Sequence, residues 1–385
     1  MIVSERPAPA AITVLPALTS LRFLAALAIV IHHCNGVFWP AADLGPLDAG
    51  VSFFFVLSGF ILTYVYVDSL RSQFAWRHFY RARIARIWPL HLFCLFATVI
   101  FVKVPEPFDP AVLLANGLML HAWIPLDRYF FSYNYPAWSI STELFFYLML
   151  PLLIRAAAWQ RYVVLALALA TVLALAQIGA AAHLPVWNTS GNHLSSTGLL
   201  YTNPLARFSE FLVGIICEMR WVKKGADAPA EKWLGTLIEC AAVGVFALAF
   251  GFYLHDGATL TASHWMPDTP LRALLGEWLS HVGLTPFAAV LIMVFAHHRG
   301  WLSHVLSQRW LVFLGEISFA LYLVHQIALR WLQQQGGHFT LLDFGLFLIC
   351  ITVLATVLHL GIEKPVRRWL VQPLRFASAQ SIVDK

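Results

Sequence analysis

About ten stretches of this chain are apolar for long enough to cross a lipid bilayer, and this pattern constrains the fold more than any other feature. A bilayer core about 30 Å thick needs roughly 20 helical residues to cross it. Because backbone groups in lipid must bond to one another, repeated apolar runs of this length predict helices. The sequence therefore predicts an all-α, polytopic helical membrane bundle of about ten transmembrane helices. The predicted spans cover residues 17–35, 49–67, 87–104, 139–157, 162–182, 204–219, 234–254, 278–297, 311–332 and 341–361.

The composition supports a membrane protein and argues against several other classes. Only 12% of the 385 residues are charged, whereas soluble domains carry about 25%. We attribute the net charge of +5 to basic loops, and it predicts no nucleic-acid partner. The 16 histidines and 5 cysteines form no HExxH motif and no Cys/His cluster, so we expect no bound metal.

Basic residues are distributed unevenly between the two sides of the predicted bundle. Of the 25 lysines and arginines, 19 fall on one side and only Lys103, Arg128 and Arg272 on the other. The positive-inside rule then places both termini in the cytoplasm. The short apolar stretch 111–123 is expected to be interfacial or re-entrant, because a crossing there would move many basic residues outside. The predicted parts are a cytoplasmic N-terminus (1–16), an integral membrane domain (17–361) and a cytoplasmic C-terminal tail (362–385).

Two ionisable residues in the first predicted span carry the strongest indication of function. Arg22 and His33 are eleven residues apart, so on a helix they share one face and lie about 16 Å from each other along the axis. Ionisable side chains within a membrane are costly and usually functional. Arginine suits phosphate, and histidine can accept a proton near neutral pH. In the alternative interpretation, Arg22 extends to the interface and His33 makes a polar packing contact.

A basic segment between the second and third predicted spans supplies a second candidate site. Arg77 and Arg81 are four residues apart, and Arg83 and Arg86 are three apart, so a helix would present them as a basic face. Contact with anionic lipid is one interpretation of such cytoplasmic arginines. The other is a binding site for a phosphorylated cytoplasmic ligand.

The fourth predicted span carries a carboxylate close to its start. Glu143 needs a partner or a proton in the membrane, and Trp138 is a natural interfacial anchor. By the predicted topology Glu143 shares the outer leaflet with His33, so the two could pair and raise the basicity of the imidazole. In the alternative interpretation, Glu143 pairs with another polar residue for packing.

Two later spans combine polar residues at helical spacing. Arg207 and Glu210 are three apart, which predicts a local ion pair or, alternatively, a wall of an acceptor site. Ser318, Tyr322 and His325 form one polar stripe on an apolar helix. His325 is either a hydrogen-bonding residue inside the bundle or a direct participant in chemistry.

Two further features are better explained by packing and anchoring. Ser58-Gly59 in the Phe-rich second span favours close approach of another helix. Glu363, followed by Lys364 and two arginines, closes the last predicted span and is expected to anchor it at the cytoplasmic face.

Seven of these segments occur in one order over nearly the whole chain. Together they resemble the membrane acyltransferase family numbered three, whose members O-acylate bacterial surface glycans and some secreted metabolites. Ser52 departs from the family pattern, since many members carry Asp there, and the chain looks like the stand-alone form without a fused esterase-like domain. The matching pieces are Arg22 with His33 (the family's Arg-x10-His motif), GVSFFFVLSGF at 50–60, FYRARIARIWP at 79–89, WSISTELFFYLMLP at 138–151, RFSEFLVG at 207–214, GEISFALYLVH at 315–325 and Glu-Lys-Pro at 363–365.

The resemblance implies transfer of an acyl group, acetyl by default, from acyl-CoA to a hydroxyl, usually on a sugar. His33 would act as general base or form an acyl-histidine, with Glu143 orienting it and Arg22 completing the catalytic set. The residues expected to hold the CoA phosphates are Arg77, Arg81, Arg83 and Arg86. Those expected to shape the site or contact the acceptor are Trp138, Ser139, Ser141, Arg207, Glu210, Tyr322 and His325.

The resemblance also implies a multi-pass protein of the bacterial inner membrane, with acyl-CoA as substrate and no bound cofactor. Its partners would be the lipid bilayer, acyl-CoA and a carbohydrate or small hydroxylated acceptor. The rival interpretation is a secondary transporter, or a polysaccharide-export partner without acyl transfer, because these also place ionisable residues in the membrane. Transporters often show broken helices in two matching halves, and we find no such symmetry in the sequence.

Overall fold

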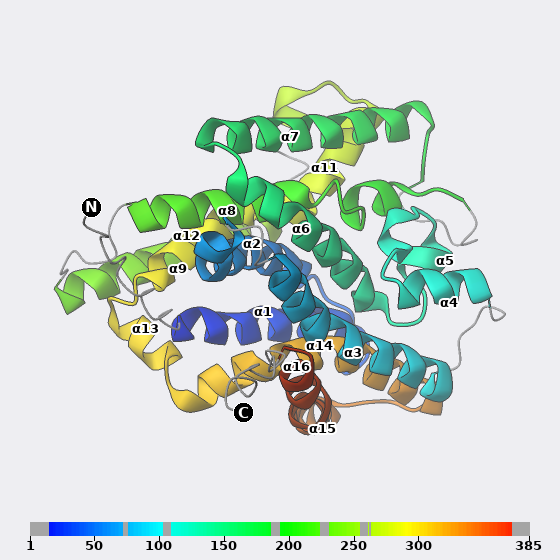
Figure 1. The fold of residues 1–385 in the computed structure, drawn as a ribbon. Helices are drawn as coiled ribbons and strands as arrows, with labels where there is room; N and C mark the ends of the chain where they lie inside the picture. Colours follow the sequence, from blue (N-terminus) through cyan, green and yellow to red (C-terminus); the bar gives the residue numbers. More distant parts are fainter. Residues whose placement is uncertain are drawn as a thin grey trace, which may run out of the picture.

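The computed structural model describes residues 15–71, 76–102, 109–185, 193–223, 231–254, 261 and 263–371. The regular structure of these residues is helical, as the apolar runs predict (Figure 1). Most of the predicted cytoplasmic N-terminus (1–16) and C-terminal tail (362–385) lies outside the described residues. The helices are α1 Pro16–Cys34, α2 Gly50–Leu70, α3 Trp76–Phe101, α4 Pro110–Gly117, α5 Asp127–Phe130, α6 Trp138–Arg155, α7 Ala158–Ala181, α8 Phe208–Lys223, α9 Lys232–Leu254, α11 Pro270–Val282, α12 Thr285–Ala296, α13 Trp301–Leu306, α14 Arg309–Gln335, α15 Leu341–Leu358 and α16 Lys364–Val371.

Among the described residues, 9 helical segments are long and apolar enough to cross a membrane, which confirms a polytopic membrane bundle. They correspond to nine of the predicted spans. The remaining one, predicted at 204–219, is the helix α8, whose 16 residues make it shorter than the others. The side of the bilayer that each terminus faces stays a prediction.

The basic segment expected to connect the second and third spans is itself helical. α3 runs without a break from Trp76 to Phe101, so Arg83 and Arg86 belong to the same helix as the apolar stretch that follows. The helix begins at Trp76, before the predicted start at residue 87. The arginines lower the local hydropathy, so a prediction from hydropathy starts the span only after them. Pro89 lies inside the helix, where it removes one backbone hydrogen bond. The continuous helix therefore carries its last two arginines into the bundle.

α1 occupies the centre of the bundle, in contact with α2, α12, α13 and α14 (Figure 1). Its approach to α14 is close because Gly315 faces the backbone of Thr19, where any Cβ would overlap the carbonyl oxygen. Ala26, Ile29 and Val30 on α1 are buried in the main apolar core. The helix that carries Arg22 and His33 is thus held by neighbours on several sides.

α2 and α8 cross at two glycines that allow backbone-to-backbone contact. A Cβ on Gly59 would overlap the carbonyl oxygen of Phe211, and one on Gly214 would overlap that of Val56. Small residues at such crossings are typical of membrane helix pairs. The close approach predicted from Ser58-Gly59 is therefore confirmed, with α8 as the partner helix.

The stretch 111–123 forms no candidate span in the part of the chain that is described. α4 ends at Gly117, and a short 3-10 turn covers His121–Trp123. The hydroxyl of Ser141 on α6 holds this segment by donating to the Met119 carbonyl at 2.6 Å and accepting from the Ala122 N–H at 3.4 Å. Ser141 therefore anchors the segment around Met119 and Ala122 to α6.

The α2–α8 crossing predicts a strong position dependence for glycine substitution. We expect Gly59→Val to destabilise the protein by about 1–3 kcal/mol or more, because the added side chain overlaps backbone that cannot give way. The measurement is thermal denaturation in detergent. Gly244→Val on α9 is the matched control, since a Cβ there meets no atom within 4 Å. Equal denaturation temperatures for the two variants would contradict the close crossing.

Candidate functional site

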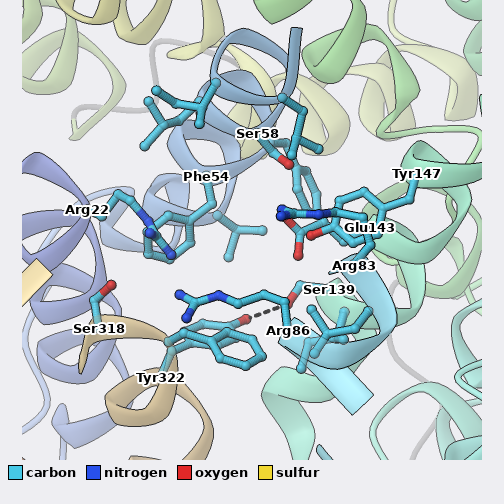
Figure 2. A pocket seen from close by; sticks show the side chains of 18 residues that line it. Arg22, Phe54, Ser58, Arg83, Arg86, Ser139, Glu143, Tyr147, Ser318 and Tyr322 are labelled. Carbon is cyan, nitrogen blue, oxygen red and sulfur yellow. Dashed lines mark hydrogen bonds between the residues drawn. The ribbon is translucent and has the colours of Figure 1, made fainter. Parts of the chain in front are cut away.

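A pocket lies between α1, α2, α3, α6 and α14, with side chains from all five helices on its wall (Figure 2). Apolar residues of α2, including Phe54 and Phe55, form one side. The polar groups come from the other four helices and from Ser58. Those polar lining residues are Arg22, Ser58, Arg83, Arg86, Ser139, Glu143, Tyr147, Ser318 and Tyr322.

Three guanidinium groups and one carboxylate give the lining of this pocket a positive balance. Arg22 approaches from α1, while Arg83 and Arg86 approach from α3 (Figure 2). The carboxylate is that of Glu143, which attracts Arg22 electrostatically and also interacts with Tyr147. A cavity with this charge suits an anionic ligand, because arginine binds phosphate and carboxylate through several hydrogen bonds at once.

Arg83 and Arg86 each have a protein partner that fixes the guanidinium. Arg83 donates a hydrogen bond of 3.1 Å to the hydroxyl of Tyr66 and lies 5.2 Å above that ring. Arg86 forms an ion pair with Glu363, whose other oxygen is 3.1 Å from Nδ1 of His359. Glu363 was expected to anchor the last span at the cytoplasmic face; it is buried and forms an ion pair with an arginine of the pocket. Its position just after a long apolar helix was the signal available in the sequence.

The structure brings together only half of the arginines assigned to donor binding. Arg83 and Arg86 line the pocket, whereas Arg77 and Arg81 are exposed and point elsewhere. Arg81 donates to the Leu370 carbonyl of α16 at 2.6 Å. The reason is helical geometry: residues 81 and 83 are two positions apart, about 200° around the axis, so they face opposite ways.

The pocket is elongated along the bundle. Its lining follows α2 from Val51 to Leu62, which is about 16 Å at 1.5 Å per residue. On α14 the lining runs from Ser318 to Tyr322. Ser139 and Tyr322 form a hydroxyl pair 2.9 Å apart on this wall (Figure 2). An extended ligand fits this shape better than a compact one.

His33 lies beyond the pocket lining and has a different partner from the one the sequence suggested. Its Nδ1 is 2.9 Å from Nε2 of His325, and the two rings stack with centroids 5.1 Å apart. Glu143 lies on the pocket wall, where it interacts electrostatically with Arg22 and with Tyr147. The expected Glu143–His33 pair is not formed, because His33 contacts His325 while Glu143 belongs to the pocket lining. A shared leaflet predicts rough depth along the bundle, and it does not determine which faces of two helices meet.

A second polar cluster surrounds a fully buried ion pair on the other side of α2. Nε of Arg207 is 2.6 Å from Glu210, and both side chains are 1% exposed, which confirms the predicted local pair. Arg207 also donates to the Ser52 hydroxyl at 2.9 Å, and its guanidinium lies 5.6 Å from the ring of Trp138. These residues do not line the pocket. Ser52 in turn donates to the His281 carbonyl at 2.9 Å. A serine hydroxyl therefore makes this contact at the position where the resemblance described above leads us to expect an aspartate.

One hydrogen-bonded His–Asp pair next to this cluster was not predicted from the sequence. Nδ1 of His281 on α11 is 2.6 Å from the carboxylate of Asp48, which precedes α2. The ring of Tyr201 lies 4.2 Å from that of His281. Asp48 directly before an apolar span was a signal that could have been followed, although nothing in the sequence indicated its partner.

Comparison with known proteins identifies relatives of the whole chain. Residues 15–360 match the family described as "Acyltransferase domain". The acyltransferase MdmB of Streptomyces mycarofaciens is 28% identical over 94% of both chains. The O-acetyltransferase OatA of Staphylococcus aureus is 21% identical over 92% of this chain and 57% of its own length. YrhL of Bacillus subtilis is 27% identical, and 55% of its length is covered, so the chain spans little more than half of these two relatives. No solved structure matches the chain.

The buried ion pair predicts strongly non-additive substitutions. We expect Glu210→Leu or Arg207→Met alone to cost about 3–5 kcal/mol, because each leaves one charge buried without its partner. The double variant should be more stable than either single variant. Thermal denaturation of the four proteins in detergent measures the cycle. Additive losses would show that the two charges are solvated independently.

Proposed function

The chain belongs to the acyltransferase family that it matches over residues 15–360, and from this premise we propose that it is an O-acyltransferase of the bacterial inner membrane. It moves an acyl group, acetyl by default, from acyl-CoA to a hydroxyl of a carbohydrate-type acceptor such as exopolysaccharide or lipopolysaccharide. The observation that carries the proposal is the elongated pocket with Arg22, Arg83 and Arg86 on its wall. His33 stands on the same continuous helix as Arg22.

The arginines would hold the phosphates of the donor. Charge-assisted, several-point contacts are what guanidinium groups offer a phosphate. By the predicted orientation, Arg22 lies toward the cytoplasm, where acyl-CoA is made. A pantetheine arm is of similar length to the separation of Arg22 and His33, about 16 Å along α1. The thioester would then reach the level of His33 while the nucleotide stays at the cytoplasmic mouth.

His33 would supply the chemistry as a general base. Its free ring nitrogen takes the proton of the acceptor hydroxyl, the oxygen attacks the thioester carbonyl, and the C–S bond breaks. The proton then passes from His33 to the departing thiolate, so the imidazole is regenerated. In the two-step variant, the imidazole nitrogen first attacks the thioester, the C–S bond breaks with release of the CoA thiolate, and an acyl-histidine forms. The acceptor hydroxyl then attacks the acyl carbon, the C–N bond breaks to regenerate the imidazole, and the hydroxyl proton passes by way of solvent to the thiolate. The Ser139–Tyr322 hydroxyl pair, whose members also donate to the Pro136 carbonyl, would shape the pocket wall.

Glu143 takes a role different from orienting His33. Its carboxylate lies on the pocket wall and attracts Arg22 electrostatically, so it would limit repulsion among the arginines. Of the other site-shaping residues, Ser139 and Tyr322 line the pocket, whereas Trp138 and Ser141 are buried beside it. Arg207 and Glu210 would act indirectly, by fixing α8 against α2.

The first prediction concerns the base. We expect His33→Ala to lower acyl transfer about 10²–10⁴-fold, the usual contribution of a general base. The measurement is transfer of label from acetyl-CoA to glycan and metabolite fractions in membranes with equal expression. His304→Ala, an exposed histidine of α13, is the control. Transfer by His33→Ala within about threefold of wild type would contradict both versions of the mechanism.

The second prediction separates the two pairs of arginines on α3. We expect Arg83→Ala to raise KM for acetyl-CoA about tenfold or more, because one charge-assisted contact is worth about 1.5–3 kcal/mol. Arg77→Ala, on the exposed face of the same helix, should leave KM nearly unchanged. Thiol release from acetyl-CoA by purified membranes is the assay, and a transporter would give none. Equal effects of the two substitutions on KM would indicate that the phosphates of CoA bind outside the pocket.

A further inference from the structure

His33 and His325 form a hydrogen-bonded pair between the two most central helices. Nδ1 of His33 on α1 is 2.9 Å from Nε2 of His325 on α14. The second ring nitrogen of His325, Nδ1, lies 3.3 Å from the carbonyl oxygen of Leu321, one turn earlier on α14. His325 is completely buried, whereas His33 is partly exposed. The His33 ring also interacts with the backbone of Ile29, one turn earlier on α1. The pair therefore has an inner member with both nitrogens engaged and an outer member that contacts His325 through Nδ1.

The direction of the hydrogen bonds follows from the chemistry of the last partner. A carbonyl oxygen only accepts, so Nδ1 of His325 carries the hydrogen. A neutral imidazole has one donor and one acceptor, so Nε2 of His325 accepts. The hydrogen between the two rings then belongs to Nδ1 of His33. This leaves Nε2 of His33 with its lone pair available.

We propose that His325 is a positioning residue that holds His33 in the Nδ1–H form, with Nε2 presented as the base. The part of this inference that concerns reaction rests on the proposed function, while the hydrogen-bonding pattern stands by itself. The second nitrogen of a catalytic histidine normally needs a partner that fixes which nitrogen is protonated. Here a neutral histidine takes the place that a carboxylate occupies in Ser-His-Asp sites.

The surroundings explain why a histidine and not a carboxylate fills this role. Asp48 interacts electrostatically with His33, but its carboxylate is 2.6 Å from Nδ1 of His281 and is already engaged. Glu143 lies on the pocket wall and attracts Arg22 electrostatically. His325 also connects the base to the pocket, because Tyr322 on the pocket wall lies one turn before it on α14. The close contact between α1 and α14 at Gly315 holds the two helices, and with them the two histidine rings, in fixed relative positions.

During the reaction the proposed pair needs no extra reactant. The acceptor hydroxyl gives its proton to Nε2 of His33, which becomes an imidazolium and keeps donating from Nδ1 to His325. When the thioester C–S bond breaks, the proton on Nε2 passes to the thiolate. His325 stays neutral throughout and does not touch the substrate.

The test is nitrogen-15 NMR of the full chain with ring-labelled histidine in lipid bilayers, which reads ring protonation without any need for activity. The His33 signals are assigned by difference with His33→Gln. We expect hydrogen on Nδ1 in the wild type and in His325→Gln, whose amide oxygen can accept the same bond. In His325→Leu the hydrogen should move largely to Nε2, the more common form of free histidine. Hydrogen on Nε2 in the wild type, or no change in His325→Leu, would overturn the proposal.

Kinetics supply the second arm of the same experiment. We expect His325→Leu to lower kcat about 10²–10³-fold with KM for acetyl-CoA unchanged, less than the roughly 10⁴-fold known for a wrong tautomer in serine proteases. His325→Gln should recover to within about tenfold of wild type. His91→Leu, a buried histidine away from the pocket, is the matched control for lost packing. Equal losses in His325→Gln and His325→Leu would overturn the positioning role, and absence of transfer by the wild type would instead refute the proposed function.

Discussion

Keeping three guanidinium groups inside a lipid-embedded bundle is the constraint on which the rest of this structure depends. An arginine in the membrane must have polar partners, because its charge cannot be removed at ordinary pH. Glu143 attracts Arg22 electrostatically, the hydroxyl of Tyr66 accepts a hydrogen bond from Arg83, and Glu363 forms an ion pair with Arg86. These partners come from three different helical segments, so the charge of the pocket can only be tolerated when the bundle is assembled.

Close helix packing is what lets so polar an interior coexist with lipid. α2 meets α8 at Gly59 and Gly214, and α14 meets α1 at Gly315, so backbones touch where side chains would otherwise separate them. Dispersion forces over such close surfaces drive association in lipid, since burying apolar groups there gains little. The close contacts bring the polar faces of α1 and α14 together. The His33–His325 bond depends on that approach.

The sequence was sufficient for the architecture and for most polar residues of the pocket, but insufficient for their pairing. Apolar runs determine where helices form, and the spacing of Arg22 and His33 determines that they share a face. That Glu143 lies in the pocket with Arg22, and apart from His33, depends on how α6 is rotated and how deep it sits, which are tertiary properties. The Arg86–Glu363 pair joins residues far apart in the chain. The separation of Arg81 from Arg83 could have been derived, because 200° of rotation is simple helix arithmetic.

One continuous helix joins the proposed phosphate site to the proposed base, so under the proposed function α1 would act as a molecular ruler. The donor would be measured from its charged end, because Arg22 would hold that end and an uninterrupted backbone determines the distance to His33. A carrier with the same thioester on a shorter arm would bind the arginines and leave its carbonyl out of reach. One residue inserted between the two positions would lengthen the ruler by only about 1.5 Å but turn His33 by about 100°. Under the proposed function, selectivity for the carrier therefore depends on the angular positions of Arg22 and His33 on a single helix.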